Sequence, residues 1–289
     1  MKNLPDFDSP ISISAFLAER RLAPQKKFGQ NFLVNRRARE RLVESLSLPP
    51  GASVWEIGPG MGAMTALLLD GGGRVTAFEI DRGFCAVLSA IFAGRENFRL
   101  VEGDALETWA GEGRADFLLG NLPYNIAARI IGGFIENGVF FKRMVVTVQR
   151  EVARRMLASP AAPDYSSFSV LCSSVYKARP VAALNRGCFY PVPNVDSEGL
   201  CLELKPESLR EGYTPFFYRM VRSLFACRRK TIKNGLLAFL KSKAVNPDLT
   251  ANAPYLLQTA GIAPDERAEN LGCEDFRRLA RVLSDAAGN

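Results

Sequence analysis

The sequence predicts an α/β protein in which a doubly wound parallel sheet is followed by a small all-helical domain. Three observations support this. Short apolar runs alternate with stretches of helical periodicity between residues 53 and 157, a glycine-rich loop follows the first of those runs, and the pattern after Pro206 is helical throughout. Alternating strands and helices produce βαβ units and a parallel sheet. A chain of 289 residues is long enough for one large and one small domain.

The first predicted elements are helices. Residues 1–24 form a polar lead-in that contains one short helix near residues 13–21. A second helix is predicted over residues 36–48, where Ala38, Leu42 and Leu46 recur at helical spacing. Proline at positions 49 and 50, followed by glycine, ends this helix.

Strands and helices then alternate. We predict strands over residues 53–57, 74–80, 98–102, 117–120 and 143–149. The intervening helices are predicted to reach about residue 69 and to cover residues 82–92, 126–137 and 151–157. Because ligands of such sheets bind at the carboxyl ends of the strands, polar residues at these ends are the first candidates for a site.

The remaining elements set the expected domain boundaries. A late strand covers about residues 199–204, and helices follow at about residues 215–226, 230–241, 252–260 and 274–284. We therefore expect a lead-in over residues 1–24, a sheet domain over residues 25–205 and a helical domain over residues 206–289.

The composition excludes several classes of chemistry. The chain contains no histidine, which removes Ser-His-Asp triads, Cys-His pairs and zinc sites of the HExxH type. Its six cysteines are scattered without a CxxC pair, so we expect no metal site and no disulfide framework, and a reducing cytoplasm fits. Neither a signal peptide nor a membrane-spanning run is predicted.

The charge distribution favours an acidic partner such as nucleic acid. The formal net charge is +7, and residues 205–243 alone hold ten Lys or Arg against two Glu. Within this stretch, Arg228, Arg229 and Lys230 are followed by Lys233 about one helical turn later. The clustering favours contact with phosphates, and the alternative is a solvated helix face.

Three successive strand ends describe a pocket for an adenosine-bearing ligand. Gly58 and Gly60 follow the first strand, and such a loop alone serves a dinucleotide, a nucleoside cofactor or tight packing. Glu79 ends the second strand and offers acceptors to ribose hydroxyls. Asp104 ends the third strand, where a carboxylate can accept from an adenine amino group. Either acid alone is more often a strand-end cap, but the combination is much more specific.

The segment Asn121-Leu122-Pro123-Tyr124 indicates chemistry on an amino group. The alternative to a catalytic role is that this segment only forms a strand-to-helix turn, since Asn and Pro are turn formers. However, the adenine amino nitrogen is a poor nucleophile until acceptors hold its hydrogens and draw its lone pair out of conjugation. The Asn121 side-chain oxygen and the Leu122 carbonyl are such acceptors. Pro123 fixes the backbone, and Tyr124 offers a stacking face.

From about Gln25 to near the end of the chain, the sequence resembles the bacterial small-subunit ribosomal RNA adenine dimethyltransferases. The resemblance lies in Gln25-Lys-Lys-Phe-Gly-Gln-Asn-Phe-Leu33, Trp55-Glu-Ile-Gly-Pro-Gly-Met-Gly62, Phe78-Glu-Ile-Asp81, Gly103-Asp-Ala105, Gly120-Asn-Leu-Pro-Tyr-Asn125, Val148-Gln-Arg-Glu-Val152, Pro193-Asn-Val-Asp-Ser197, Phe225-Ala-Cys-Arg-Arg-Lys-Thr-Ile-Lys-Asn234 and Arg267-Ala-Glu-Asn270.

The resemblance implies a Rossmann-like, S-adenosylmethionine-dependent methyltransferase. It implies dimethylation of two adjacent adenosines near the 3′ end of 16S rRNA, in the pre-small ribosomal subunit, by a cytoplasmic monomer. Cofactor contacts are implied for Asn31, Leu33, Gly58, Gly60, Glu79, Asp104 and Asn121. RNA backbone contacts are implied for Arg228, Arg229, Lys230 and Lys233. Phe189 resembles the family aromatic that faces Tyr124 across the target base.

Some residues depart from the family pattern, and rival functions remain. Tyr190 stands where the family usually has Thr, so Phe189 or Tyr190 could be the stacking aromatic. The nearest rival is a large-subunit rRNA adenine methyltransferase of the antibiotic-resistance type. A ribosome-assembly factor and a methyltransferase acting on protein glutamine are the others. The basic segment with Arg228 and the Arg267-Ala-Glu-Asn270 segment favour the small-subunit family.

Overall fold

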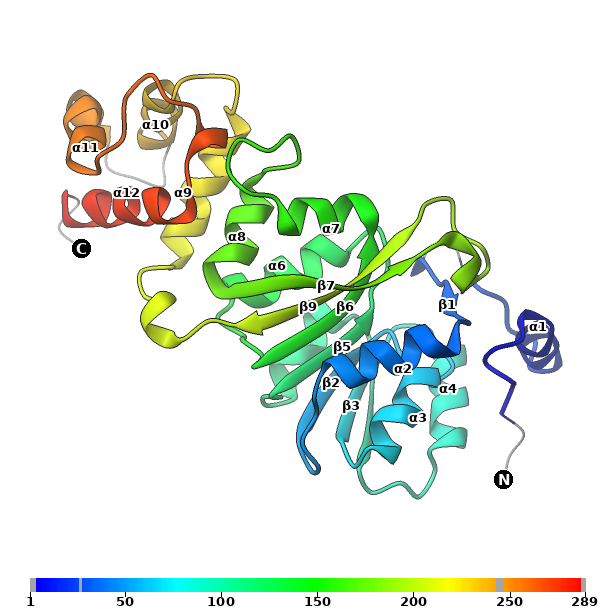
Figure 1. Cartoon of the computed structure of the whole chain (residues 1–289). Helices are drawn as coiled ribbons and strands as arrows, with labels where there is room; N and C mark the ends of the chain where they lie inside the picture. Colours follow the sequence, from blue (N-terminus) through cyan, green and yellow to red (C-terminus); the bar gives the residue numbers. More distant parts are fainter. Residues whose placement is uncertain (1–3, 26–27, 243–246, 287–289) are drawn as a thin grey trace. The chain divides into compact units, whose positions relative to one another are not determined.

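The computed structural model describes residues 4–25, 28–242 and 247–286 (Figure 1). Lys26 and Lys27 of the first motif and Lys243 of the basic stretch lie outside these residues. The described chain divides into two compact units. The first comprises the described residues up to Gly133, Val139–Ala153 and Ala178–Leu204, and the second comprises Phe134–Gly138, Arg154–Lys177 and the described residues from Lys205 onward.

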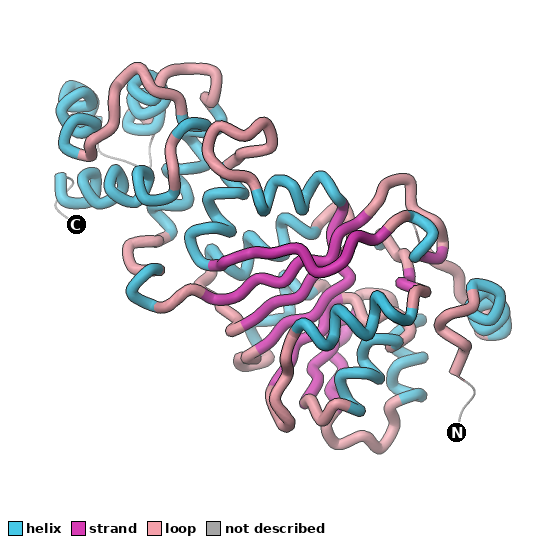
Figure 2. Tube along the Cα trace, in the orientation of Figure 1, coloured by secondary structure: helices cyan, strands magenta, loops and turns pink. Residues whose placement is uncertain are grey.

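The predicted α/β fold is confirmed, with one large sheet lying among helices (Figure 2). The sheet is mixed rather than purely parallel. Its strands follow the order β4 (Phe98–Glu102), β3 (Arg74–Glu79), β2 (Ser53–Ile57), β5 (Phe117–Asn121), β6 (Arg143–Gln149), β9 (Ser197–Leu204) and β7 (Tyr176–Leu184). The strands from β4 to β6 pair in parallel. β9 runs antiparallel to β6, with Thr147 opposite Gly199.

Helices cover both faces of the sheet, as a doubly wound fold requires (Figure 1). The part of the chain up to Leu157 contributes α1 (Pro10–Glu19), α2 (Arg36–Ser45), α3 (Ala63–Asp70), α4 (Arg82–Ile91), α5 (Ala105–Thr108), α6 (Ala127–Glu136) and α7 (Arg150–Leu157). α2, α3 and α4 pack on one face through a cluster that includes Leu42, Leu68 and Leu88. On the other face Trp55 makes edge contacts with Phe78 and Phe141.

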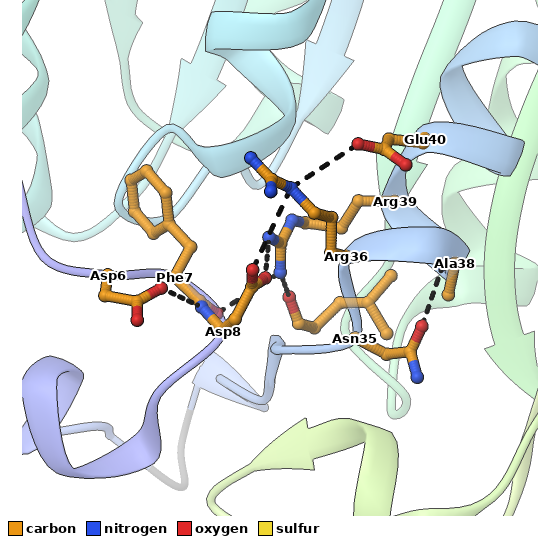
Figure 3. A network of polar contacts seen from close by, with 9 residues as sticks. Asp6, Phe7, Asp8, Asn35, Arg36, Ala38, Arg39 and Glu40 are labelled. Atoms are coloured by element: carbon orange, nitrogen blue, oxygen red, sulfur yellow. Dashed lines mark hydrogen bonds and ion pairs between the residues drawn. The ribbon is translucent and has the colours of Figure 1, made fainter.

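The lead-in is fixed to this unit by one buried arginine. Arg39 of α2 is 5% exposed, and its guanidinium donates to the carbonyl oxygens of Phe7 (3.2 Å) and Leu33 (2.7 Å). It also pairs with the carboxylate of Asp8 (Figure 3). Three acceptors offset the cost of burying this charge. The polar start of the chain therefore lies against the two-residue strand β1 (Phe32–Leu33), which pairs with β8 (Phe189–Tyr190).

The second unit is helical but wider than the expected domain of residues 206–289. Its helices are α8 (Ser167–Val175), α9 (Pro215–Ala226), α10 (Ile232–Leu240), α11 (Ala253–Thr259) and α12 (Cys273–Ala286). α8 belongs to it because this helix packs against α9 and α12. The hydroxyl of Tyr165 also donates to the carbonyl oxygen of Leu271 at 2.8 Å. Neither α8 nor β7 was predicted from the sequence.

Candidate active site

The glycine loop between β2 and α3 adopts a backbone that side chains would not permit. Gly58, Gly60 and Gly62 have φ values of +69°, +57° and +85°, in the left-handed region that glycine favours. A Cβ atom at Gly60 would lie 3.0 Å from the ring of Phe32, and one at Gly62 would lie 2.7 Å from Phe92. Gly58 and Gly60 line a pocket of the sheet unit, while Gly62 serves close packing.

Glu79 and Asp104 lie at neighbouring strand ends and line the same pocket. The Glu79 carboxylate is 5% exposed and accepts from the N–H groups of Gly60 (3.1 Å) and Asp81 (2.9 Å). Burial raises the pKa of Glu79 to about 7, although both hydrogen bonds act in the opposite direction. Asp104 also caps α5 by accepting from the N–H of Leu106 at 2.9 Å. The cap and the pocket position thus coexist at Asp104.

Asn121 is held with a defined amide orientation. Its Nδ2 donates to the carbonyl oxygen of Asn31 at 2.7 Å, so its Oδ1 points away from that carbonyl as an acceptor. Asn31, Asn121 and Pro123 all line the pocket. Leu122 is buried, and its N–H donates to the carbonyl oxygen of Thr147 on β6 at 3.1 Å. The end of β5 is therefore anchored on both sides.

The predicted aromatic residues lie in different surroundings. The Tyr124 hydroxyl is 2.7 Å from Oγ of Ser197, the fully buried first residue of β9. Burial raises the pKa of Tyr124, so this hydroxyl stays protonated. Phe189, by contrast, is 1% exposed and packs in the core cluster with Leu33. Tyr190 is partly exposed.

The structure brings most of the predicted cofactor residues together. The pocket lining includes the predicted Asn31, Gly58, Gly60, Glu79, Asp104, Asn121 and Pro123. It does not include Leu33, Leu122, Tyr124 or Phe189, and the Leu33 side chain is buried in the core. Sequence reasoning missed the lining residues Phe28, Gln30 and Phe32, although they lie within the first motif. It also missed Ser197, which tethers Tyr124.

The four basic residues predicted to contact RNA lie in the second unit, between α9 and α10 or at the start of α10, and all are exposed. Arg228 pairs with Glu269 at 2.8 Å. Within the described part of the chain, we find no carboxylate paired with Arg229, Lys230 or Lys233. These three cations are therefore free to meet an anionic ligand.

The segment of residues 267–270 supports the basic cluster. Glu269 holds Arg228, and Thr231 forms a β-bridge with Arg267. The N–H of Ile232 also donates to the carbonyl oxygen of Glu266 at 2.6 Å. Two sequence motifs that lie about forty positions apart thus form one structural feature.

None of the helices in the described ranges combines the length and the apolar character that a bilayer crossing requires.

Comparison with known proteins connects this geometry to a family. The model of the ribosomal RNA adenine dimethylase family matches residues 22–285. The chain is 40% identical over 285 residues to the ribosomal RNA small subunit methyltransferase A of Treponema denticola, and the alignment covers 96% of both proteins.

Two solved structures share the architecture. A dimethyladenosine transferase from Plasmodium falciparum matches with a TM-score of 0.73 and 27% identity, covering 88% of this chain and 97% of that one. The 23S rRNA methyltransferase ErmE matches with a TM-score of 0.62 and 26% identity, covering 87% and 99%. The methyltransferase fold expected from the sequence is confirmed by these matches. With its family model spanning nearly all of its residues, the chain belongs to the ribosomal RNA adenine dimethylase family.

Proposed function

We propose that this protein transfers methyl groups from S-adenosylmethionine to the N6 atoms of two adjacent adenosines near the 3′ end of 16S rRNA. The observation that carries the proposal is the Asn121 amide, whose acceptor oxygen is oriented by Asn31 in the pocket that Glu79 lines. Family membership and the small-subunit relative support the substrate. The enzyme acts as a monomer on the pre-small subunit in the cytoplasm.

The pocket residues fit an adenosine-bearing cofactor. Gly58 and Gly60 line the pocket and carry no Cβ, so a ligand can approach the backbone closely there. Glu79 presents carboxylate oxygens to ribose hydroxyls, and Asp104 accepts from an adenine amino group. S-adenosylmethionine, when bound, supplies an electrophilic methyl group. Asn31 and the neighbouring residues of the first motif would cover it from the N-terminal side.

The chain's own residues activate the target nitrogen without a strong base. Asn121 Oδ1 and the Leu122 carbonyl oxygen accept hydrogen bonds from the adenine amino group, which concentrates the lone pair on nitrogen. Donors and acceptors fixed before the reaction stabilise the charge that develops in the transition state. The nitrogen takes the methyl group with S-adenosylhomocysteine as the other product, and the amino proton, now acidic, passes to solvent. A proton released in this way needs no strong base, which agrees with a chain that lacks histidine. Pro123 restricts the backbone of this segment.

The target base must leave its stack to reach the pocket. Tyr124 supplies one stacking face, and the Ser197 hydrogen bond fixes its hydroxyl end. Phe189 is proposed as the opposite face, with Tyr190 as the alternative. Because Phe189 is buried in the core, its stacking on the base requires the segment around β8 to shift when RNA binds.

We assign catalysis to residues 25–205 and RNA binding mainly to residues 206–289. The basic excess of residues 205–243 supports this division, because phosphate contacts supply most of the affinity of non-specific RNA binding. Arg229, Lys230 and Lys233 provide free cations, whereas Nε and Nη2 of Arg228 are engaged by Glu269 and leave only its Nη1 donors for RNA.

One experiment tests the proposal directly. The protein is incubated with labelled S-adenosylmethionine and either unmethylated small subunits or, in a parallel reaction, unmethylated large subunits, and the modified bases are mapped. We expect dimethyladenosine at two adjacent positions near the 3′ end of 16S rRNA, and no label with the Asn121→Ala variant. Label in 23S rRNA instead, together with macrolide resistance in cells, would establish the function of the ErmE type. Label on a glutamine side chain of a ribosomal protein would establish glutamine methylation, and binding without any label would indicate an assembly factor.

A further inference from the structure

A buried carboxylate beside the pocket gathers hydrogen bonds from three parts of the chain. Asp81 is 5% exposed and lies two residues after Glu79. Its Oδ1 accepts from the N–H of Gly83 at 2.9 Å and caps α4. Its Oδ2 accepts from Nε2 of Gln25 and from Nε2 of Gln30, both at 2.9 Å. The backbone N–H of Gln25 donates in turn to Oε1 of Gln30 at 2.7 Å, so the two glutamines are locked to each other.

Capping alone does not account for this arrangement. A helix N-cap requires one acceptor, which Ser, Thr or Asn provides as well as Asp. The second oxygen of Asp81 serves amides that lie 51 and 56 positions earlier in the chain. Only a carboxylate accepts at both oxygens, so the two glutamines account for an acid at this position.

The network connects the two groups on which the proposed chemistry depends. On one side, the backbone N–H of Asp81 donates to Oε1 of Glu79 at 2.9 Å. On the other side, Gln30 precedes Asn31, whose carbonyl oxygen receives the Asn121 amide at 2.7 Å. Gln30, Asn31, Glu79 and Asn121 all line the pocket, whereas Asp81 does not. Asp81 thus lies behind the wall of the pocket and touches both of its sides.

We propose that Asp81 is a positioning residue that holds the segment of residues 28–33 over the cofactor pocket and, through Asn31, sets the orientation of Asn121. The inference rests on the proposed function, because it assigns Asp81 a part in the same methyl transfer. Cofactor affinity depends on Asp81 through the covering segment and Glu79. Turnover depends on it through the Asn121 amide.

The first test is Asp81→Asn, which keeps the shape of the side chain and its capping oxygen. The new Nδ2 faces the Nε2 groups of the two glutamines, so donors oppose donors and the segment is released. Because hydrogen bonds to a charged group are the strong ones, we expect the dissociation constant for S-adenosylmethionine to rise roughly ten- to hundredfold. The kcat on small subunits should also fall when the cofactor is saturating. Asp70→Asn, an exposed change of the same charge at the end of α3, is the matched control and should leave both values unchanged.

The second test is rescue by exchanging the groups. In the double variant Asp81→Asn with Gln30→Glu, a carboxylate at position 30 accepts from the new amide at position 81, and the N–H of Gln25 keeps its acceptor. The net charge equals that of the parent. We expect the double variant to recover part of the lost affinity and kcat, because the contact at position 30 is restored while Nε2 of Gln25 still faces the amide. Gln30→Glu alone places two carboxylates together and is impaired. A purely structural cap at Asp81 would not respond to a change at position 30.

The outcomes are separable from those of the proposed function. Calorimetry with S-adenosylmethionine needs no RNA, so a parent protein that binds the cofactor but modifies other bases still tests Asp81. The proposal is overturned if Asp81→Asn binds the cofactor within twofold of the parent. It is also overturned if the double variant stays as weak as the single one while its thermal unfolding matches that of the parent.

Discussion

At the scale of single residues, the Asn121 amide has its donor side engaged and its acceptor side directed away from Asn31. We expect Asn121→Ala to lower the rate of methyl transfer on the order of a hundredfold or more, because an acceptor matched to the reacting group is lost. Single-turnover assays on small subunits measure this rate. Asn121→Asp is the informative companion: its carboxylate cannot donate to the Asn31 carbonyl, so it should be impaired although it keeps acceptors. Near-normal rates for Asn121→Ala would refute the mechanism.

Substitutions at Phe189 can show whether its ring stacks on the target base or only packs in the core. Replacing this buried ring by Ala would leave a cavity and cost about 3–5 kcal/mol of stability, which would obscure any effect on catalysis. Phe189→Leu keeps apolar volume but removes the aromatic face. If Phe189 stacks on the base, turnover on RNA falls with unchanged cofactor affinity, and the second methylation suffers more than the first. If only Tyr190→Ala lowers the single-turnover rate, the stacking aromatic is Tyr190.

Glu79 makes cofactor binding dependent on pH. Burial places its pKa at about 7, so the free site takes up a proton as the pH falls through this value. A protonated carboxyl has lost one acceptor for the ribose, and affinity for S-adenosylmethionine should therefore decrease on the acid side, by up to about tenfold per pH unit. Glu79→Gln should bind weakly with no such dependence. Titration of the parent and of Glu79→Gln with S-adenosylmethionine, at constant ionic strength, would detect this difference in pH dependence. The useful range is about one pH unit on each side of the pKa of Glu79.

At the scale of elements, periodicity and burial explain what the sequence could predict. The bounds of β2, β4 and β6 agree with the predicted strands, because short apolar runs between turn residues mark strands in a covered parallel sheet. α8 was not predicted because seven of its nine residues are buried. A helix without an exposed polar face shows no alternation of apolar and polar residues at helical spacing. β7 contains Pro180, and it lies at the sheet edge, where proline is tolerated.

In the site, too, the residues at strand ends could be predicted from local patterns, whereas contacts between residues far apart in the chain could not. Gly60, Glu79 and Asp104 could be predicted because they lie at or just after the ends of strands whose carboxyl ends meet at one edge of the sheet. The contact that orients Asn121 comes from Asn31, ninety positions earlier, and no local pattern contains it. The burial of Phe189 likewise depends on the pairing of β8 with β1.

The connection between α9 and α10 should control RNA affinity. We expect the joint replacement of Arg229, Lys230 and Lys233 by Ala to weaken RNA binding. The slope of the logarithm of the binding constant against the logarithm of the salt concentration should become shallower by about one unit per lost phosphate contact. Affinity measured at several salt concentrations gives the slope. Arg95→Gln, an exposed change in the sheet unit, is the control. An unchanged slope would mean that these cations are merely solvated and make no phosphate contact.

At the scale of the whole molecule, the two units separate two kinds of binding. All residues that line the cofactor pocket belong to the first unit, and the free cations of the basic cluster belong to the second. The RNA-binding variants should therefore keep the parent affinity for S-adenosylmethionine, while Glu79 variants keep their affinity for RNA. This separation makes each class of variant a control for the other.

The stability of the sheet unit should depend on pH through a second buried acid, Glu56. Glu56 of β2 is fully buried; its Oε2 accepts from the Thr65 hydroxyl at 2.6 Å, and its Oε1 has no partner among the described residues. Burial is the main reason that the pKa of Glu56 is raised to about 7, and the nearby Glu79 raises it further. Between the ordinary value of 4.5 and about 7, the folded chain binds the proton that the unfolded chain has released, so the free energy of unfolding decreases as the pH rises.

Replacing Glu56 by Gln removes this proton equilibrium while an amide oxygen still accepts from Thr65. The stability of Glu56→Gln relative to the parent should therefore increase as the pH rises from about 5 to about 8, because only the parent must bury a charge at the alkaline end. Thermal unfolding of both proteins without cofactor, at matched ionic strength, gives the difference in Tm at each pH. A difference in Tm that stays constant over this range would show that Glu56 does not titrate in the folded protein, and that the buried acid is held in one protonation state by its surroundings.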